Sequence, residues 1–203
     1  ADIGTDHAYL PAALILSGKI PSAVAADLRK GPLENAAETV RNNCIEDKVQ
    51  LRLSDGLKCV RPDEADDIVI AGMGGILISE ILTAADWVKD PKYKLILQPQ
   101  SHDEDVRRYL FTNGFEITDE EVCFEDGKVY ICIGAFFTGN IQPHTDAEIM
   151  FGNILKRNDE AAVSFKNKKI RRISARLSAI RAHGGDEGER LCLESILKAI
   201  PHS

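Results

Sequence analysis

The first 27 residues, ADIGTDHAYLPAALILSGKIPSAVAAD, set the pattern by which the rest of the chain is interpreted. Asp2-Ile3 is typical of the end of a strand, and the spacing of apolar residues predicts a helix over 8–17 that Gly18 ends. The apolar run at 22–27 predicts a buried strand. A strand, a turn, a helix and a second strand form the repeating unit of a parallel α/β sheet. Because the chain opens at a strand end, we expect the authentic N-terminus to lie upstream.

The same alternation of short apolar runs and helical patterns continues to residue 138. Further strands are predicted at 49–53, 67–71 and 93–97, and further helices at 32–43, 76–85 and 103–113. Two β-rich runs, 115–124 and 128–137, flank Glu125-Asp126-Gly127, and Asp-Gly between such runs is a hairpin signal. The sequence therefore predicts an α/β fold whose parallel sheet carries an antiparallel hairpin at one edge.

From residue 145 onward the apolar residues fall at helical spacing. Gly184-Gly185 interrupts the pattern and Pro201 ends it, which predicts two long antiparallel helices with a shorter helix before them. The two long helices must pack on each other, since a single apolar stripe would stay in water. We therefore expect two domains: an α/β domain over 1–140 and a small α-helical, coiled-coil-like domain over 145–203.

Composition narrows the class of protein. The chain has 203 residues, of which 44% are hydrophobic and 28% are charged, as in ordinary globular proteins. No apolar run approaches the roughly 20 residues of a membrane helix, and no signal peptide is visible. The five cysteines are scattered, without a CxxC pair or zinc spacing, so reduced thiols are favoured and no metal site is predicted. We expect a cytoplasmic monomer with no membrane partner and no metal.

The charge of the chain is unevenly distributed. Between Lys156 and His183 there are nine Lys or Arg residues and two acidic residues, so this segment carries +7. The net charge of the whole chain is −7, which leaves −14 for the remainder. An acidic body with a basic arm is the asymmetry expected when one part of a protein meets phosphate. A solvated helix face explains the same residues equally well.

Polar residues and glycines stand where the first two predicted strands end. Gly4 permits a tight turn beside a ligand, and Asp2 can meet a cationic amino group. A plain corner with Asp6 as a helix cap stays an open alternative. Asp27 follows Gly4 by 23 residues and can accept hydrogen bonds from ribose hydroxyls, although acidic residues at strand ends are common. The loop lacks GxGxxG and is acidic, which disfavours a nicotinamide-dependent dehydrogenase.

The next three strand ends carry similar signals. Asp55-Gly56 is either an acceptor for the exocyclic amine of adenine or an ordinary turn. Gly72-Met73-Gly74-Gly75 leaves a bare backbone that a flat base or a methyl group can approach closely. Gln98 and Gln100 can read base edges, or this segment simply leads into a capped helix. In this order along the chain, the motifs predict one cleft shaped for adenosine and methionine.

The stretches ADIGTDHAYLP (1–11), AGMGG (71–75), ILQPQ (96–100) and FEDGKVYICI (124–133) resemble the bacterial tRNA adenine-22 N1-methyltransferase family. The resemblance extends over nearly the whole chain, including the helical C-terminal part. It implies a Rossmann-like methyltransferase domain followed by a helical domain, with S-adenosylmethionine as cofactor, tRNA as partner and N1-methyladenine as product. The chain departs from the family at Gln100, where Asn is more usual, and lacks the helix and most of the strand that precede ADIG.

Site residues follow from the resemblance motif by motif. It implies a methionine end at Asp2, Gly4 and Asp6, a ribose contact at Asp27, an adenine contact at Asp55-Gly56, and a methyl-transfer face at Gly72, Met73 and Gly74. Asp6, Gly74 and Gln98 are the residues expected to act in catalysis. The expected RNA contacts lie on the basic arm, at Lys166, Lys168, Lys169, Arg171, Arg172 and Arg176.

Adenine N1 has a free lone pair, so the transfer requires positioning of the base more than a strong general base. Asp6 is a candidate for stabilising the cationic product or taking a proton. Tyr9 either stacks on the base or packs its helix, and His7 is more typical of a structural turn residue. Two alternatives stay open: a methyltransferase acting on a small molecule or a protein, and a non-catalytic module that binds S-adenosylmethionine.

Overall fold

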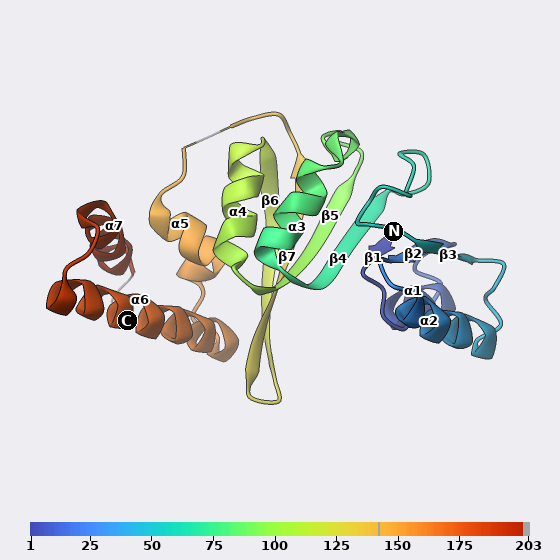
Figure 1. The fold of residues 1–203 in the computed structure, drawn as a ribbon, viewed down its shortest axis with the longest axis horizontal. Coiled ribbons are helices and arrows are strands. Elements are labelled where there is room, and N and C mark those ends of the chain that lie inside the picture. Colours follow the sequence, from blue (N-terminus) through green and yellow to red (C-terminus); the bar gives the residue numbers. More distant parts are fainter. Residues whose placement is uncertain (142, 201–203) are drawn as a thin grey trace.

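Seven strands form one mixed sheet at the centre of the computed structural model, which describes residues 1–141 and 143–200 (Figure 1). The strands are β1 (Asp2–Ile3), β2 (Ala23–Asp27), β3 (Val49–Leu53), β4 (Asp67–Gly74), β5 (Lys94–Ser101), β6 (Phe115–Glu125) and β7 (Lys128–Phe137). Their order across the sheet is β3-β2-β1-β4-β5-β7-β6. The first five are parallel, and β7 runs antiparallel to both β5 and β6. The predicted α/β class and edge hairpin are confirmed.

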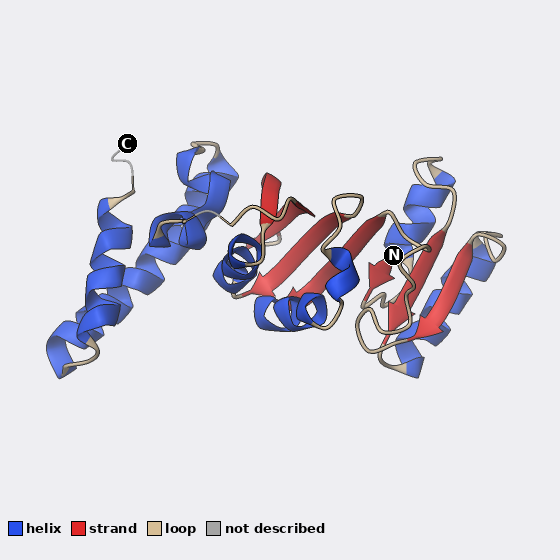
Figure 2. Cartoon of the chain, turned by 90° about the horizontal axis from the view of Figure 1, so that it is seen from above, coloured by secondary structure: helices blue, strands red, loops and turns tan. Residues whose placement is uncertain are grey.

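Helices connect the strands and form the C-terminal part. They are α1 (Tyr9–Leu16), α2 (Lys30–Asn42), α3 (Gly75–Thr83), α4 (Asp103–Thr112), α5 (Asp146–Phe151), α6 (Glu160–His183) and α7 (Glu187–Lys198), with short 3-10 helices η1 (Asp86–Val88) and η2 (Gly152–Lys156). Seen from above in Figure 2, α6 and α7 lie beyond the end of the sheet that β6 forms. The predicted pair of long helices with a shorter helix before them is confirmed, while the predicted end at Pro201 lies outside the described residues. No helix among the described residues is long and apolar enough to cross a membrane.

Two buried apolar clusters fill the space between helices and sheet. The larger one joins Ile70 of β4 and Leu97 of β5 to α3 and α4, and it continues into Phe151 of α5 and Phe165 of α6. The smaller one packs Ala25 of β2 against α1 and α2. Full burial of one such aliphatic or aromatic side chain contributes about 1.5–3 kcal/mol. Because Phe151 and Phe165 belong to the larger cluster, that cluster spans the predicted boundary at 140–145. The division into two domains stays a prediction.

Strands β4 and β5 are longer than the sequence predicted, since each continues into the motif that was expected to follow it. Met73 pairs with Pro99 and Gly74 pairs with Ser101, with shifts of register on either side of Met73. Gly72 has a φ of +77°, a value that glycine adopts without strain. A bulge of this kind lets a strand continue past an irregularity and absorbs a proline that has no N–H to donate.

A buried guanidinium joins the sheet to the C-terminal helices. The side chain of Arg107 on α4 is fully buried, its Nε lies 2.7 Å from Oε1 of Glu120 on β6, and its Nη1 lies 2.6 Å from Oδ2 of Asp103. The same Nη1 donates to the carbonyl oxygens of Ile149 and Met150 on α5. Because a buried charge without partners is costly, these contacts fix α4, β6 and α5 in one arrangement.

Gly152 gives a direct test of this arrangement. A Cβ at Gly152 would collide with Oε2 of Glu120 and lie 2.5 Å from Nε of Arg107. We predict that Gly152→Ala destabilises the protein in two ways. Disturbing the buried ion pair costs about 3–5 kcal/mol, and the backbone strain costs about 1–3 kcal/mol more. Chemical denaturation measures the loss of stability.

Gly184→Ala is the matched control. Gly152 (φ 56°, ψ −147°) and Gly184 (φ 79°, ψ 165°) occupy similar glycine-type conformations, but no described atom lies within 4 Å of a Cβ at Gly184. This variant carries the backbone strain alone. Equal losses of stability in the two variants would contradict the proposed role of the buried ion pair.

Candidate active site

The carboxyl ends of five parallel strands meet at one edge of the sheet and bring the predicted motifs together. Ile3 of β1 pairs with Ala26 of β2 on one side and with Ile70 of β4 on the other. Ile70 in turn pairs with Leu97 of β5. The residues that follow these positions are the Gly4 turn, Asp27, the glycine segment 72–75 and Gln98, so they lie side by side. This edge is the usual ligand site of an open α/β sheet.

The turn after β1 is held by the backbone. The N–H groups of Gly4 and Thr5 both donate to the carbonyl oxygen of Ala26, at 2.8 and 3.0 Å. Gly4 has a φ of +80°, and a Cβ there would collide with the terminal methyl of Met73. The Thr5 hydroxyl is buried and has no hydrogen-bond partner among the described residues. Burial raises the pKa of the Asp2 carboxyl above its ordinary value.

The acidic residues of the site differ in exposure. Asp27 is buried, with 8% of its surface exposed, and its Oδ1 accepts the N–H of Arg29 at 2.8 Å. The side chain of Asp55 is 59% exposed and pairs with Lys58 at 2.5 Å. The side chain of Asp6 is 70% exposed and lies 3.5 Å from Nε2 of His7. Of these three, Asp27 is therefore the carboxylate that the fold fixes most firmly at this edge.

Gln98 supports the glycine segment. Its Oε1 accepts the N–H of Gly72 at 2.8 Å, so this amide oxygen is occupied by the backbone of the neighbouring strand. A Cβ on Gly75, the first residue of α3, would collide with the carbonyl oxygen of His102. The backbone of the turn after β5 thus leaves no room for a side chain at Gly75. The sequence did not predict the hydrogen bond between Gln98 and Gly72, because the two residues are 26 positions apart.

An aromatic pair lies next to the Gly4 turn. The rings of His7 and Tyr9 stack with centroids 4.9 Å apart and an interplanar angle of 5°. Tyr9 is 65% exposed, so it does not pack its helix against the core. Within residues 1–141 and 143–200, no cluster of three or more His, Cys, Asp or Glu side chains is arranged to hold a metal ion.

The predicted RNA contacts on α6 separate into three groups. Lys166 and Lys169 are buried against other parts of the chain, and their contact with RNA stays a prediction. The Nζ of Lys166 donates to the carbonyl oxygen of Arg157 at 2.5 Å. Arg176 is exposed but forms two 2.7 Å bonds with Glu189 of α7. Lys168, Arg171 and Arg172 are exposed, and their spacing places them on the outward face of the helix.

Comparison with known proteins agrees with this geometry. Residues 1–133 match a family model described as a methyltransferase domain. The tRNA (adenine(22)-N(1))-methyltransferase of Bacillus subtilis is 41% identical over 130 residues, which cover 64% of this chain and 55% of that protein. The match thus spans little more than half the length of this curated relative.

Two solved structures match over 98% of this chain. The first is a putative tRNA (m1A22) methyltransferase of Streptococcus pneumoniae in complex with S-adenosyl-L-methionine, with 31% identity, a TM-score of 0.82 and 88% of its chain covered. The second is the B. subtilis M1A22 tRNA methyltransferase TrmK, with 29% identity, a TM-score of 0.84 and 87% covered. The fold and the site thus define a Rossmann-like methyltransferase. More narrowly, the chain belongs to the tRNA (adenine-22 N1)-methyltransferase family.

The bond between Gln98 and Gly72 leads to a prediction about the glycine segment. Replacing Gln98 with Leu removes the acceptor, so we expect the amide of Gly72 to exchange its hydrogen faster. The loss of stability should not exceed about 1 kcal/mol, since the amide is exposed and water replaces the missing acceptor. Hydrogen exchange followed by NMR measures this effect. Gln100→Leu is the control. Gln100 is also exposed near Gly72, since its Nε2 would lie 3.8 Å from a Cβ there, but the acceptor of the Gly72 N–H is Gln98. Equal effects of the two variants would contradict the assignment.

Proposed function

We propose that this protein transfers the methyl group of S-adenosylmethionine to N1 of an adenine in tRNA. The observation that carries the proposal is the convergence of Gly4, Asp27 and the glycine segment 72–75 at one sheet edge. Support comes from the S. pneumoniae relative, whose structure is described with this cofactor, and from the activity in the name of the B. subtilis relative. The cytoplasmic location and the monomeric state stay predictions.

The residues at the sheet edge fit this cofactor. Asp27 presents a buried carboxylate that can accept ribose hydroxyls, and the Thr5 hydroxyl, which has no partner among the described residues, lies in the adjacent turn. Asp2 stands before the same turn, where a carboxylate can meet the cationic amino group, and Asp55 can accept the adenine amine. Gly56, Gly72 and Met73 would border the bound molecule. When bound, S-adenosylmethionine supplies an electrophilic methyl group.

The residues around the turn would position the target base. The exposed ring of Tyr9, stacked on His7, offers an aromatic face of the kind on which RNA-binding proteins stack unpaired bases. Asp6 would stabilise the positive charge that develops on the methylated adenine, and the lone pair of N1 makes a strong base unnecessary. Gly74 leaves room at the transfer face, while Gln98 acts by holding Gly72. A base within a stem must leave its stack to reach this edge.

The outward face of α6 would hold the RNA backbone. Lys168, Arg171 and Arg172 are exposed there. On the same helix, Arg176 and Arg181 form ion pairs with Glu189 and Glu194 of α7. The first three cations are the best candidates for phosphate contacts, and Arg176 could join them only by exchanging Glu189 for phosphate.

The direct test of the function is transfer of labelled methyl groups to unmodified bulk tRNA, followed by nucleoside analysis. We expect N1-methyladenosine from the parent protein and none from Gly74→Val, whose side chain fills the transfer face. Asp27→Ala should weaken cofactor binding by roughly 10- to 150-fold, since a hydrogen bond to a charged group contributes about 1.5–3 kcal/mol. Calorimetry with S-adenosylhomocysteine measures the binding.

Glu46→Ala, which removes an exposed carboxylate between α2 and β3, should bind the cofactor as the parent does. A cofactor-binding preparation that methylates no nucleoside in tRNA would refute the tRNA assignment. It would leave a methyltransferase acting on a small molecule or a protein, or a binding module.

The RNA interface makes a separate prediction about salt. For each phosphate that the protein no longer neutralises, the slope of log affinity against log salt should fall by about 0.7–0.9. Replacing Lys168, Arg171 and Arg172 with Met should therefore reduce the slope by about 2–3, as measured by filter binding of tRNA. The control removes the same charge from the opposite end of the molecule, at Lys19, Arg41 and Lys48, which are exposed. An equal reduction in the control would count against the α6 interface.

A further inference from the structure

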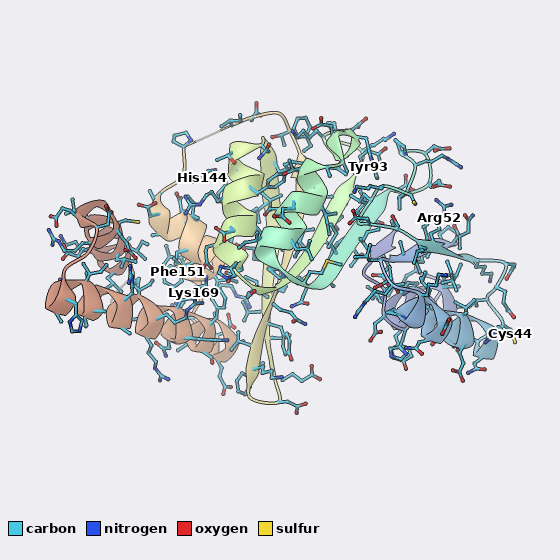
Figure 3. The ribbon with its side chains drawn as sticks, in the orientation of Figure 1. Cys44, Arg52, Tyr93, His144, Phe151 and Lys169 are labelled. Carbon is cyan, nitrogen blue, oxygen red and sulfur yellow. The ribbon has the colours of Figure 1, made fainter. Side chains whose placement is uncertain are left out.

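Lys169 connects the C-terminal helices to the segment that follows β5. Its side chain is only 6% exposed, and its Nζ lies 3.0 Å from Oδ1 of Asp103 and 2.6 Å from Oε2 of Glu104. Both acids belong to the first turn of α4 and have side chains that are 12% and 17% exposed. Figure 3 shows Lys169 where α6 passes α5, and its Nζ lies 3.5 Å from Sδ of Met150 on that helix. The contact is thus an enclosed one between two parts of the chain 65 residues apart.

The acids that Lys169 holds adjoin the candidate active site through the backbone. Asp103 follows His102, whose φ of +55° turns the chain sharply from β5 into α4. The carbonyl oxygen of His102 packs so closely against Gly75 that a Cβ there would collide with it. One residue earlier, Ser101 pairs with Gly74. We expect a displacement of Asp103 to reach Gly75, because the carbonyl oxygen of His102 lies directly against it.

The charge of Lys169 keeps the neighbouring acid Glu104 ionised. Although burial alone would raise the pKa of Glu104, Lys169, with smaller contributions from a backbone hydrogen bond and Arg172, lowers it to about 2, so the acid stays ionised at neutral pH. Arg107 holds the second acid from the other side, at 2.6 Å from Oδ2 of Asp103. Asp103 therefore bridges two cations, one on α4 and one on α6. An apolar residue at position 169 could fill the same space but could not hold the two carboxylates.

We propose that Lys169 is a positioning residue, which couples the RNA-binding face of α6 to the glycine segment beside the transfer site through Asp103 and Glu104. The inference rests on the proposed function. It assigns different roles to two adjacent lysines: Lys168 contacts phosphate from the outward face of α6, and Lys169 transmits the position of the helix to the active site. Loss of Lys168 should weaken RNA binding, whereas loss of Lys169 should slow methyl transfer from bound RNA.

The matched pair Lys168→Met and Lys169→Met tests this assignment in the whole protein. With saturating S-adenosylmethionine, Lys169→Met should lower kcat for tRNA about tenfold or more, since small misplacements of reacting groups are costly. Lys168→Met should raise KM for tRNA severalfold. Lys169→Arg should recover much of kcat, because it restores a cation between the two acids. Glu104→Gln, which removes one acid without creating a cavity, should also lower kcat.

Hydrogen exchange of the free protein supplies a second readout that needs no methylation. In Lys169→Met, the amides of residues 100–105 and 72–76 should exchange about tenfold faster, while Lys168→Met leaves them unchanged. A change in KM alone for Lys169→Met, or a lower melting temperature with normal kcat and unchanged exchange, would overturn the proposal. If exchange is faster in Lys169→Met but the parent protein methylates no tRNA, the coupling is supported and the proposed function is refuted.

Discussion

The fully buried charge of Arg107 is the constraint on which the shape of this protein depends. A guanidinium without water must be met by carboxylates and carbonyl oxygens, and here these come from α4, β6 and α5. Removing either carboxylate leaves the buried guanidinium with a single acidic partner, which costs more than breaking an exposed pair would. The sheet and the C-terminal helices are therefore joined in a single geometry, and Lys169 on α6 extends the same network.

The candidate active site depends on this geometry and on the order of the strands. Parallel strands with right-handed connections necessarily bring their carboxyl ends to one edge, so motifs far apart in the sequence become neighbours. The glycine segment then packs backbone against backbone with the turn after β5, at Gly75 and His102. Such contacts make the site stiff, which suits a reaction that depends on the placement of a base more than on proton transfer.

Much of this could be predicted from the sequence, because the signals are local. The alternation of apolar runs indicated the α/β class, Asp126-Gly127 indicated the hairpin, and the motifs at strand ends indicated the position of the site. The rest could not, because it depends on contacts between distant segments. The sequence shows how many cations α6 carries, but it does not show that Lys169 faces α4. Nor could the strand ends be placed correctly, because a bulge at Gly72 let two strands continue through their motifs.

The register of α6 has a consequence for how the family can change over evolution. An α-helix turns by about 100° per residue, so inserting one residue before Lys169 would rotate every later side chain to a different face. The cations that now point outward would turn toward the acids of α4, and the apolar stripe with Ile173 and Leu177 would turn into water. Insertions and deletions should therefore collect after His183, where Gly184 and Gly185 are exposed, and α6 should vary by substitution alone.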